Sequence, residues 1–369
     1  MKTIDVRVRR AIAAVAKGRP IVVTDDATHG DEGYLIFAAE AATPKLLAFV
    51  VRHTSGYVRV ALPPTECERL NLPPMCHGDD DRSASAHRVA VDWSGTGTGI
   101  SATDRARTIA ALAAARSRAE DFRRPGHVVP VQTNAGGVLG RPGSAEAAVD
   151  LARLAGRREA GVFCEIVSRD RPGAMARGAE LAEFADEYGL TVVSIDDLVA
   201  YRRRTEPQVL RLAETMLPTA AGASRVIGFR GAHDGGEHLV VIVGTAGPGV
   251  PVPLHVHVEC LTGDVFGSTA CRCGGELDNA LTTMTARGSG MIVYLRPSRP
   301  VHACGLSGGG DAAAALLASD TVGWILRDLG VHAVSLSDDT PGFGLVMFGA
   351  IREHGLYVAE RGSALAVAG

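Results

Sequence analysis

Three cysteines close together in the second half of the chain carry the clearest chemical signal in the sequence. Cys260 lies in the run Glu259-Cys-Leu-Thr-Gly-Asp264, and Cys271 and Cys273 follow in Cys271-Arg-Cys-Gly274. Zinc prefers thiolate and imidazole ligands in a tetrahedron, and a site with three protein ligands leaves the fourth position to a water that the metal activates. The spacing therefore predicts a zinc ion that is held by these three thiolates and available for hydrolytic chemistry.

A fourth protein ligand would change the role of that zinc ion. His255, His257 and Cys304 are the residues that could provide it. A site with four protein ligands is structural, because no position is left for water. Buried cysteines without metal are a further alternative, against which the Cys-x-Cys spacing argues. The sequence alone leaves the choice between an open and a closed site undecided.

The elements that must position these residues form two blocks of alternating helix and strand. In the first block we expect helices at residues 4–17, 104–119, 145–155 and 177–188, and strands at 19–24, 56–60, 160–164 and 190–194. The charged run Arg202-Arg-Arg-Thr-Glu-Pro207 ends in a proline and is the predicted linker. Strands at 224–229 and 239–243 open the second block, which contains the cysteines. We therefore expect two domains, residues 1–204 and 208–369.

Length and composition narrow the class of protein. The 369 residues, 46% of them hydrophobic, suffice to form a core in each of two domains. A formal net charge of -3 gives no reason to expect nucleic acid or an acidic membrane as a partner. No apolar run reaches the roughly 18 residues of a membrane helix, and the N-terminus lacks a signal peptide's apolar segment, so a cytoplasmic location is expected. Three of the 7 cysteines share one site, which fits a reducing compartment.

Both blocks resemble enzymes of riboflavin biosynthesis. Residues 4–204 resemble 3,4-dihydroxy-2-butanone 4-phosphate synthase through motifs spread along the block: Thr24-Asp-Asp26, Asp31-Glu-Gly33, Arg52-His53, Ser101 to Arg105, Arg124-Pro-Gly-His127, Ala135-Gly-Gly-Val-Leu139 and Ile195-Asp-Asp-Leu-Val-Ala-Tyr201. Residues 208 to about 350 resemble GTP cyclohydrolase II through His257, the run Glu259 to Asp264, the cysteines, Tyr294 with Arg296, and Ile325-Leu-Arg-Asp-Leu-Gly330. The resemblance implies an α+β protein with an N-terminal α/β sandwich, a C-terminal zinc-binding α+β domain, and assembly as a homodimer.

The synthase-like block departs from its family where metal and substrate bind. The resemblance implies a Mg²⁺ pair held by a glutamate and a histidine, and these positions are Gly30 and Ser144 here. A substrate-binding aspartate is replaced by Tyr34, and a phosphate-contacting threonine by Ala145. Mg²⁺ is therefore not expected as a cofactor, and neither is synthase activity. The block keeps several positions that form a vestigial substrate site: Asp26, Glu32, His53, His127, Arg141 and Glu165.

The cyclohydrolase-like block keeps its zinc ligands and loses the groups that bind a triphosphate. The resemblance implies that zinc-bound water attacks the guanine ring of GTP, while arginines and a lysine hold the phosphates. The segment from Arg296 to Leu306 lacks the family's arginine spacing, and Ser337-Asp-Asp-Thr340 places acids where the phosphates would lie. Like charges repel strongly in a site of low dielectric, so GTP is not the expected substrate.

The remaining candidate residues surround the cysteines. His257, Glu259 and Glu276 could move protons for a zinc-bound water, and Tyr294 and Arg296 occupy positions that the resemblance marks as functional. His257 and Glu259 alternate along a predicted strand, so their side chains share a face. The alternative for both is support of the zinc ligands.

Three functions follow from these observations. The first is a zinc hydrolase whose substrate is a heterocycle without a triphosphate, possible examples being purines and pyrimidines. The second is a non-catalytic paralogue that acts as a scaffold or modulator of riboflavin enzymes. The third is residual activity in riboflavin biosynthesis. An open zinc beside a polar pocket would favour the first, whereas a fourth protein ligand or a filled pocket would favour the second.

Overall fold

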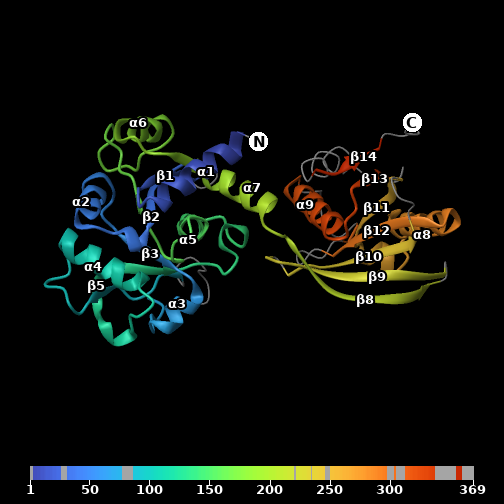
Figure 1. Cartoon of the computed structure of the whole chain (residues 1–369), viewed down its shortest axis with the longest axis horizontal. Coiled ribbons are helices and arrows are strands. Elements are labelled where there is room, and N and C mark those ends of the chain that lie inside the picture. The colour runs from blue at the N-terminus through green and yellow to red at the C-terminus, as the bar shows by residue number, and fades with distance from the viewer. Residues whose placement is uncertain are drawn as a thin grey trace. The chain divides into compact units, whose positions relative to one another are not determined.

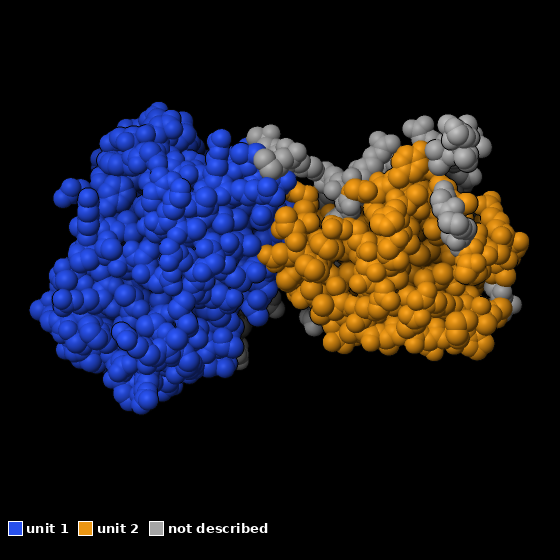
Figure 2. Space-filling model, in the orientation of Figure 1, with its two compact units in different colours: residues 1–202 blue, residues 203–369 orange. Residues whose placement is uncertain are grey.

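The computed structural model of the chain describes residues 3–25, 31–76, 86–219, 222–233, 235–245, 250–296, 303–304, 312–336 and 355–359, with the backbone alone at 312–317. The chain divides into two compact units, Met1–Arg202 and Arg203–Gly369. Figure 1 labels the elements of each unit, and Figure 2 shows the units as space-filling surfaces in different colours. No helix among the described residues is long and apolar enough to cross a membrane.

A mixed sheet of seven described strands forms the centre of the first unit. Its order is β4-β5-β3-β6-β2-β1-β7. The neighbours β1 with β7 and β3 with β5 are parallel, and the other pairs are antiparallel. The strands are β1 (Ile21–Thr24), β2 (Gly33–Ala38), β3 (Arg59–Leu62), β4 (Val91–Trp93), β5 (Phe122–Gln132), β6 (Gly161–Glu165) and β7 (Val192–Ser194).

Helices cover both faces of this sheet, as Figure 1 shows. On one face α1 (Thr3–Ala16), α5 (Ser144–Leu154) and α7 (Ile195–Thr205) bury apolar side chains such as Val8, Leu151 and Leu198. On the other, α2 (Pro44–His53), α4 (Ala102–Ala113) and α6 (Ala179–Tyr188) bury Leu47, Ile109 and Leu181. A sheet buried on both faces needs strands that are apolar throughout, which explains Ile21-Val-Val. The expected α/β sandwich is confirmed.

Short helical segments complete the first unit. They are α3 (Pro64–Arg69), η2 (Ala39–Ala41), η4 (Ala119–Asp121) and η5 (Gly137–Leu139). The helix expected at 104–119 ends at Ala113, because Ala114 is extended (φ -79°, ψ 128°). Arg69 binds the carbonyl groups of Ala115 and Ser117 and so fixes the turn that follows. The strand expected at 56–60 is β3, which begins at Arg59 and ends at Leu62.

The predicted linker is partly wrong, because α7 continues to Thr205. Arg202 is only 4% exposed and donates to a carboxylate oxygen of Asp150 on α5 at 2.6 Å. It also donates to the carbonyl oxygen of Gly136 at 2.9 Å. A buried charge needs such partners, so the first arginine of the run belongs to the core of the first unit.

The second unit is built on another mixed sheet, with seven described strands in the order β14-β13-β11-β12-β10-β9-β8. The neighbours among β11, β12, β13 and β14 are parallel, and the others are antiparallel. The strands are β8 (Val209–Thr219), β9 (Gly222–Gly231), β10 (Glu237–Gly244), β11 (Val252–Val258), β12 (Ser289–Leu295), β13 (Ala333–Leu336) and β14 (Tyr357–Val358). The expected strands at 224–229 and 239–243 lie within β9 and β10. The sequence did not predict β8, which is exposed along most of its length.

Two helices pack against this sheet. Helix α8 (Cys273–Arg287) buries Ala280 and Met284 against Val243 and Ile292. Helix α9 (Ala312–Asp328) buries residues near its end, Val322, Ile325 and Leu326, in a separate cluster. A π-helical turn, Leu261–Val265, follows β11. Strand β11, α8 and the parallel strand β12 form a βαβ unit, whose strand ends are the usual place for a ligand site.

Candidate functional site

The cysteines gather at the carboxyl ends of β11 and β12. Cys260 follows β11 and caps the π-helical turn, Cys271 lies in the next loop, and Cys273 opens α8. Cys304 comes from the segment after β12. Because β11 and β12 are parallel neighbours, the chain that leaves each strand emerges at the same edge of the sheet. This topology brings Cys304 to cysteines that lie more than thirty residues before it.

The four sulfur atoms of these cysteines all lie within 4.8 Å of one another. The sulfurs of Cys260 and Cys271 are 3.9 Å apart, and those of Cys273 and Cys304 are 3.7 Å apart. These separations exclude disulfide bonds, which are about 2.0 Å long. Among the described residues this is the one group of potential ligands compact enough to hold a metal ion. Its donor set is the one that zinc prefers.

Backbone and hydroxyl donors surround the sulfur of Cys260. The amides of Gly263 and Cys304 donate to it at 3.4 and 3.5 Å, and the hydroxyl of Thr262 lies 3.4 Å away. Burial opposes ionisation of this thiol, but the hydrogen bonds outweigh burial and lower the pKa of Cys260 to about 6. The thiolate that a metal needs is therefore favoured by the protein itself.

Asp264 organises the residues behind the cluster. Its carboxylate accepts from the amide of Cys260 at 2.8 Å and from the hydroxyl of Tyr294 at 2.7 Å. The Nε2 atom of His257 lies 3.0 Å from the same carboxylate, and the His257 ring stacks on Tyr294. Burial, together with the bond to Asp264, raises the pKa of Tyr294. His257 and Tyr294 thus face Asp264, and their contacts fix the backbone at Cys260, which is the supporting role.

The other candidates in this unit form ion pairs. Arg296 donates to the carboxylate of Glu259 at 2.9 Å. The backbone amide of Glu259 donates a hydrogen bond to the carbonyl oxygen of Leu295, which continues the pairing of β11 with β12. Glu276 lies in the first turn of α8, 3.7 Å from Arg272, whose side chain is 90% exposed. Asp338 and Asp339, which we expected to repel a triphosphate, lie outside the described residues.

In the first unit, the replaced metal and substrate positions lie near each other. The side chains of Tyr34 on β2 and Ser144 at the start of α5 are close enough to interact. Tyr34 lies directly opposite Glu165 in the sheet. Burial, and next the charge of Glu165, raise the pKa of Tyr34, so the phenol stays neutral. A phenol and a hydroxyl therefore occupy the place where the resemblance implies a carboxylate and a metal-bound imidazole.

Glu165, the retained catalytic glutamate of the resemblance, is held by the chain itself. Arg59 forms an ion pair with one of its oxygens, and the hydroxyl of Ser55 donates to the other at 3.1 Å. The Arg59 guanidinium also lies 4.3 Å from the centre of the Phe163 ring. Arg59 was not among the residues predicted from the sequence.

The other retained positions of the first unit are occupied by separate contacts. Arg177 donates to Glu32 at 2.8 Å, and Arg141 donates to the buried Glu146 at 2.8 Å. The Nδ1 atom of His127 is 2.7 Å from Asp92. Asp26, Gly30 and the loop around them lie outside the described residues.

His53 belongs to an aromatic cluster at the end of α2. Its ring centre is 4.6 Å from that of Phe49 and 5.0 Å from that of Tyr188. Burial, followed by the charges of Arg169 and Arg52, lowers the pKa of His53. These contacts are those of a neutral packing residue.

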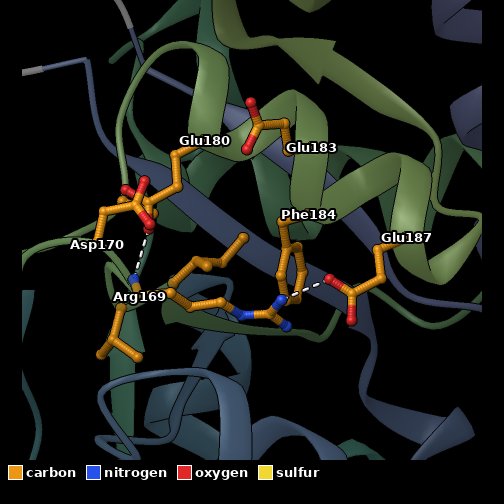
Figure 3. A pocket seen from close by; sticks show the side chains of 9 residues that line it. Arg169, Asp170, Glu180, Glu183, Phe184 and Glu187 are labelled. Atoms are coloured by element: carbon orange, nitrogen blue, oxygen red, sulfur yellow. Dashed lines mark hydrogen bonds and ion pairs between the residues drawn. The ribbon is translucent and has the colours of Figure 1, made fainter.

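A small surface pocket of about 80 Å³ lies beside this cluster, as Figure 3 shows. Several acids line it, and the side chain of Arg169 crosses it over the ring of Phe184. The Arg169 side chain pairs with Glu187, and its amide donates to Glu180 at 2.5 Å. Arg169 therefore binds two of the acids that line the pocket, Glu180 and Glu187.

Comparisons with known proteins match both units. The family model of 3,4-dihydroxy-2-butanone 4-phosphate synthase matches residues 9–201, and that of GTP cyclohydrolase II matches residues 210–304. The riboflavin biosynthesis protein RibBA of Nocardia farcinica is 51% identical over 290 residues, which cover 78% of this chain and 70% of the relative. RibBA of Mycolicibacterium gilvum is 45% identical over 377 residues, covering 96% of this chain and 88% of the relative.

Solved structures also match this chain. RibBX from A. baumannii, described as a two-domain 3,4-dihydroxy-2-butanone 4-phosphate synthase, is 30% identical with a TM-score of 0.71, and the match covers 96% of this chain and 99% of that one. A 3,4-dihydroxy-2-butanone 4-phosphate synthase in complex with two magnesium ions is 40% identical with a TM-score of 0.51, covering 54% of this chain and 97% of that one. The chain belongs to the RibBA-type riboflavin-biosynthesis family, in which a 3,4-dihydroxy-2-butanone 4-phosphate synthase domain precedes a GTP cyclohydrolase II domain.

Proposed function

We propose that this chain is an enzyme of riboflavin biosynthesis with a low turnover rate. This proposal is supported by the match of both units to the two enzyme families. RibBA relatives that are 51% identical support it as well. These comparisons favour the family's own chemistry over the changed heterocyclic substrate that the sequence suggested first. The geometry of the first unit supports the low rate, because Arg59 forms an ion pair with Glu165.

The chemistry explains why the rate should fall. The related synthase was solved with two magnesium ions, and a hard cation of this kind stabilises charge that develops on substrate oxygens. Ser144 offers no imidazole for such an ion, and position 30 is a glycine. Mg²⁺ is therefore not proposed as a resident cofactor. In the second unit zinc is the proposed metal, with Cys260, Cys271 and Cys273 among its ligands.

The proposal is tested by assaying the full-length, zinc-loaded chain with ribulose 5-phosphate and Mg²⁺, and separately with GTP, using mass spectrometry to detect products. We expect slow product formation from ribulose 5-phosphate, at least about a hundredfold below the rate of the relatives, since even small displacements of catalytic groups cost that much. Glu165→Gln should abolish this product. Product from GTP requires a zinc position that is open to water, and Cys271→Ser should abolish any such product. Glu183→Gln, an exposed carboxylate on α6, is the matched control. Turnover at the rate of the relatives would contradict the proposal, and so would the absence of both products.

A second candidate, a non-catalytic scaffold or modulator of riboflavin enzymes, is favoured by the contact between Tyr34 and Ser144. The chain's own side chains fill positions where a substrate and a metal would otherwise bind. Absence of both products in the assay would select this candidate. The expected homodimer belongs to this proposal as well, and light scattering of the purified chain tests it.

A further inference from the structure

We infer that Cys304 is the fourth ligand of the zinc site, so that four thiolates enclose the ion and its role is structural. This inference goes beyond the proposed function and does not depend on any turnover. It concerns a residue outside the Cys260, Cys271 and Cys273 motif, and it decides whether zinc can activate water.

The distances between the sulfurs fit a tetrahedral site. A zinc–sulfur bond of about 2.3 Å places neighbouring sulfurs of a regular tetrahedron about 3.8 Å apart. The separation is 3.9 Å between Cys260 and Cys271, and 3.7 Å between Cys273 and Cys304. All four sulfurs lie within 4.8 Å of one another, which is close to what one ion would impose. Cys304 thus completes the set that the other three cysteines begin.

Contacts that involve no metal hold Cys304 in this place. Its amide donates to the sulfur of Cys260 at 3.5 Å. Its carbonyl oxygen accepts from the hydroxyl of Thr262 at 3.2 Å. The neighbouring Ala303 is only 4% exposed. Both the backbone amide and the carbonyl oxygen of Cys304 are therefore hydrogen-bonded to the turn after β11. These two bonds place the Cys304 thiol in the cluster.

The two histidines that could compete for the fourth position lie outside the cysteine cluster. His257 directs Nε2 to Asp264 and stacks on Tyr294. His255 is 1% exposed and lies beside the His257 ring, with ring centres 5.9 Å apart. Neither histidine belongs to the group of potential ligands around the cysteines. With four sulfurs around it, zinc has no position for water, and it joins the turn after β11, the start of α8 and the segment after β12.

Cobalt(II), bound in place of zinc to the full chain, tests the inference. The intensity of sulfur-to-cobalt charge-transfer absorption increases with the number of thiolate ligands. We expect one ion per chain and the spectrum of a tetrahedral site with four thiolates. Cys304→Ala should lose about a quarter of that absorption and release zinc to a chromogenic chelator at least about tenfold faster. Cys76→Ser, which changes an exposed cysteine of the first unit, should leave both measurements unchanged.

Two results would overturn the inference. One is a Cys304→Ala spectrum that is identical to that of the unmodified chain. The other is a spectrum of the unmodified chain that indicates three thiolates and an oxygen ligand. The second result needs no variant, so the test stands even where Cys304→Ala does not fold. Because neither measurement uses a substrate, failure here is distinct from failure of the proposed function.

Discussion

The two units differ in whether they keep the residues that could bind a metal ion. In the first unit, the positions that the resemblance assigns to two protein ligands of a metal are Gly30 and Ser144. In the second unit, the three cysteines of the motif remain and Cys304 lies with them. A catalytic metal is dispensable to a fold with a large core, whereas a structural metal supplies part of the folding free energy. If zinc binds as we infer, the fold of the second unit, more than its chemistry, requires the metal.

Zinc removal should give the largest difference between the units. Chelation of the full chain, or Cys271→Ser, is expected to unfold the segment around the cluster, because structural zinc contributes on the order of 10 kcal/mol in small metal-dependent domains. Hydrogen exchange followed by mass spectrometry reads peptides of each unit separately. Exchange should rise in peptides that span 258–287 and stay constant in those of β1, β2 and β6. If hydrogen exchange stays constant in both units, the units do not differ in their dependence on zinc. Cys76→Ser is the control.

We expect the stability of the first unit to depend on buried side chains, whereas the stability of the second unit should depend on metal. Arg202→Ala removes the nearer and more buried of the two arginines that pair with Asp150, and breaking a buried pair costs roughly 3–5 kcal/mol. The side chains of Arg202 and Asp150 are at most 4% exposed. Denaturant unfolding should show this loss, and the exposed Arg116→Ala should change the free energy of unfolding by less than about 0.5 kcal/mol. An equal effect of the two substitutions would show that the pair is not needed.

Restoring the metal positions of the first unit should raise its activity. In the combined variant Gly30→Glu, Tyr34→Asp and Ser144→His, we expect turnover of ribulose 5-phosphate at least about a hundredfold above that of the unmodified chain, and only with Mg²⁺ present. Tyr34→Asp alone restores no metal ligand and serves as the matched control. If the combined variant is no faster than this control, the loss lies in other groups, and the pairing of Arg59 with Glu165 becomes the first suspect.

Support for the zinc cluster should be measurable at Tyr294. Tyr294→Phe removes the 2.7 Å hydrogen bond to Asp264 and should lower the stability of the second unit by about 1–2 kcal/mol. Tyr357→Phe, at a position that is 49% exposed, is the control. Exchange of the Cys260 amide, which also binds Asp264, should increase in the first variant alone. Unchanged exchange would mean that Asp264 holds the turn without Tyr294.

The sequence was sufficient for the parts of the site that lie close together along the chain. The cysteine motif, the two blocks and the helices α1, α4, α5 and α6 could be predicted from local patterns and from the resemblance. Cys304 could not be chosen over His255 or His257, because its position depends on the parallel pairing of β11 with β12. Arg59 was missed for the same reason. Its pairing opposite Phe163 places it diagonally from Glu165, a neighbour more than a hundred residues away.

Local composition misled where tertiary contacts decide. The run from Arg202 to Pro207 has the charge of a linker, yet Arg202 is buried against Asp150. Strand β8 contains Pro218 and exposed residues, so it lacks the pattern of a buried strand, and pairing with β9 is what defines it.

X-ray absorption at the zinc edge of the full chain tests the central contrast most directly, because it counts the atoms bound to the ion without any substitution. We expect four sulfur neighbours at about 2.3 Å and no nitrogen or oxygen neighbour. Three sulfurs with one oxygen would contradict it, because zinc in the second unit would then keep the open position that hydrolysis requires.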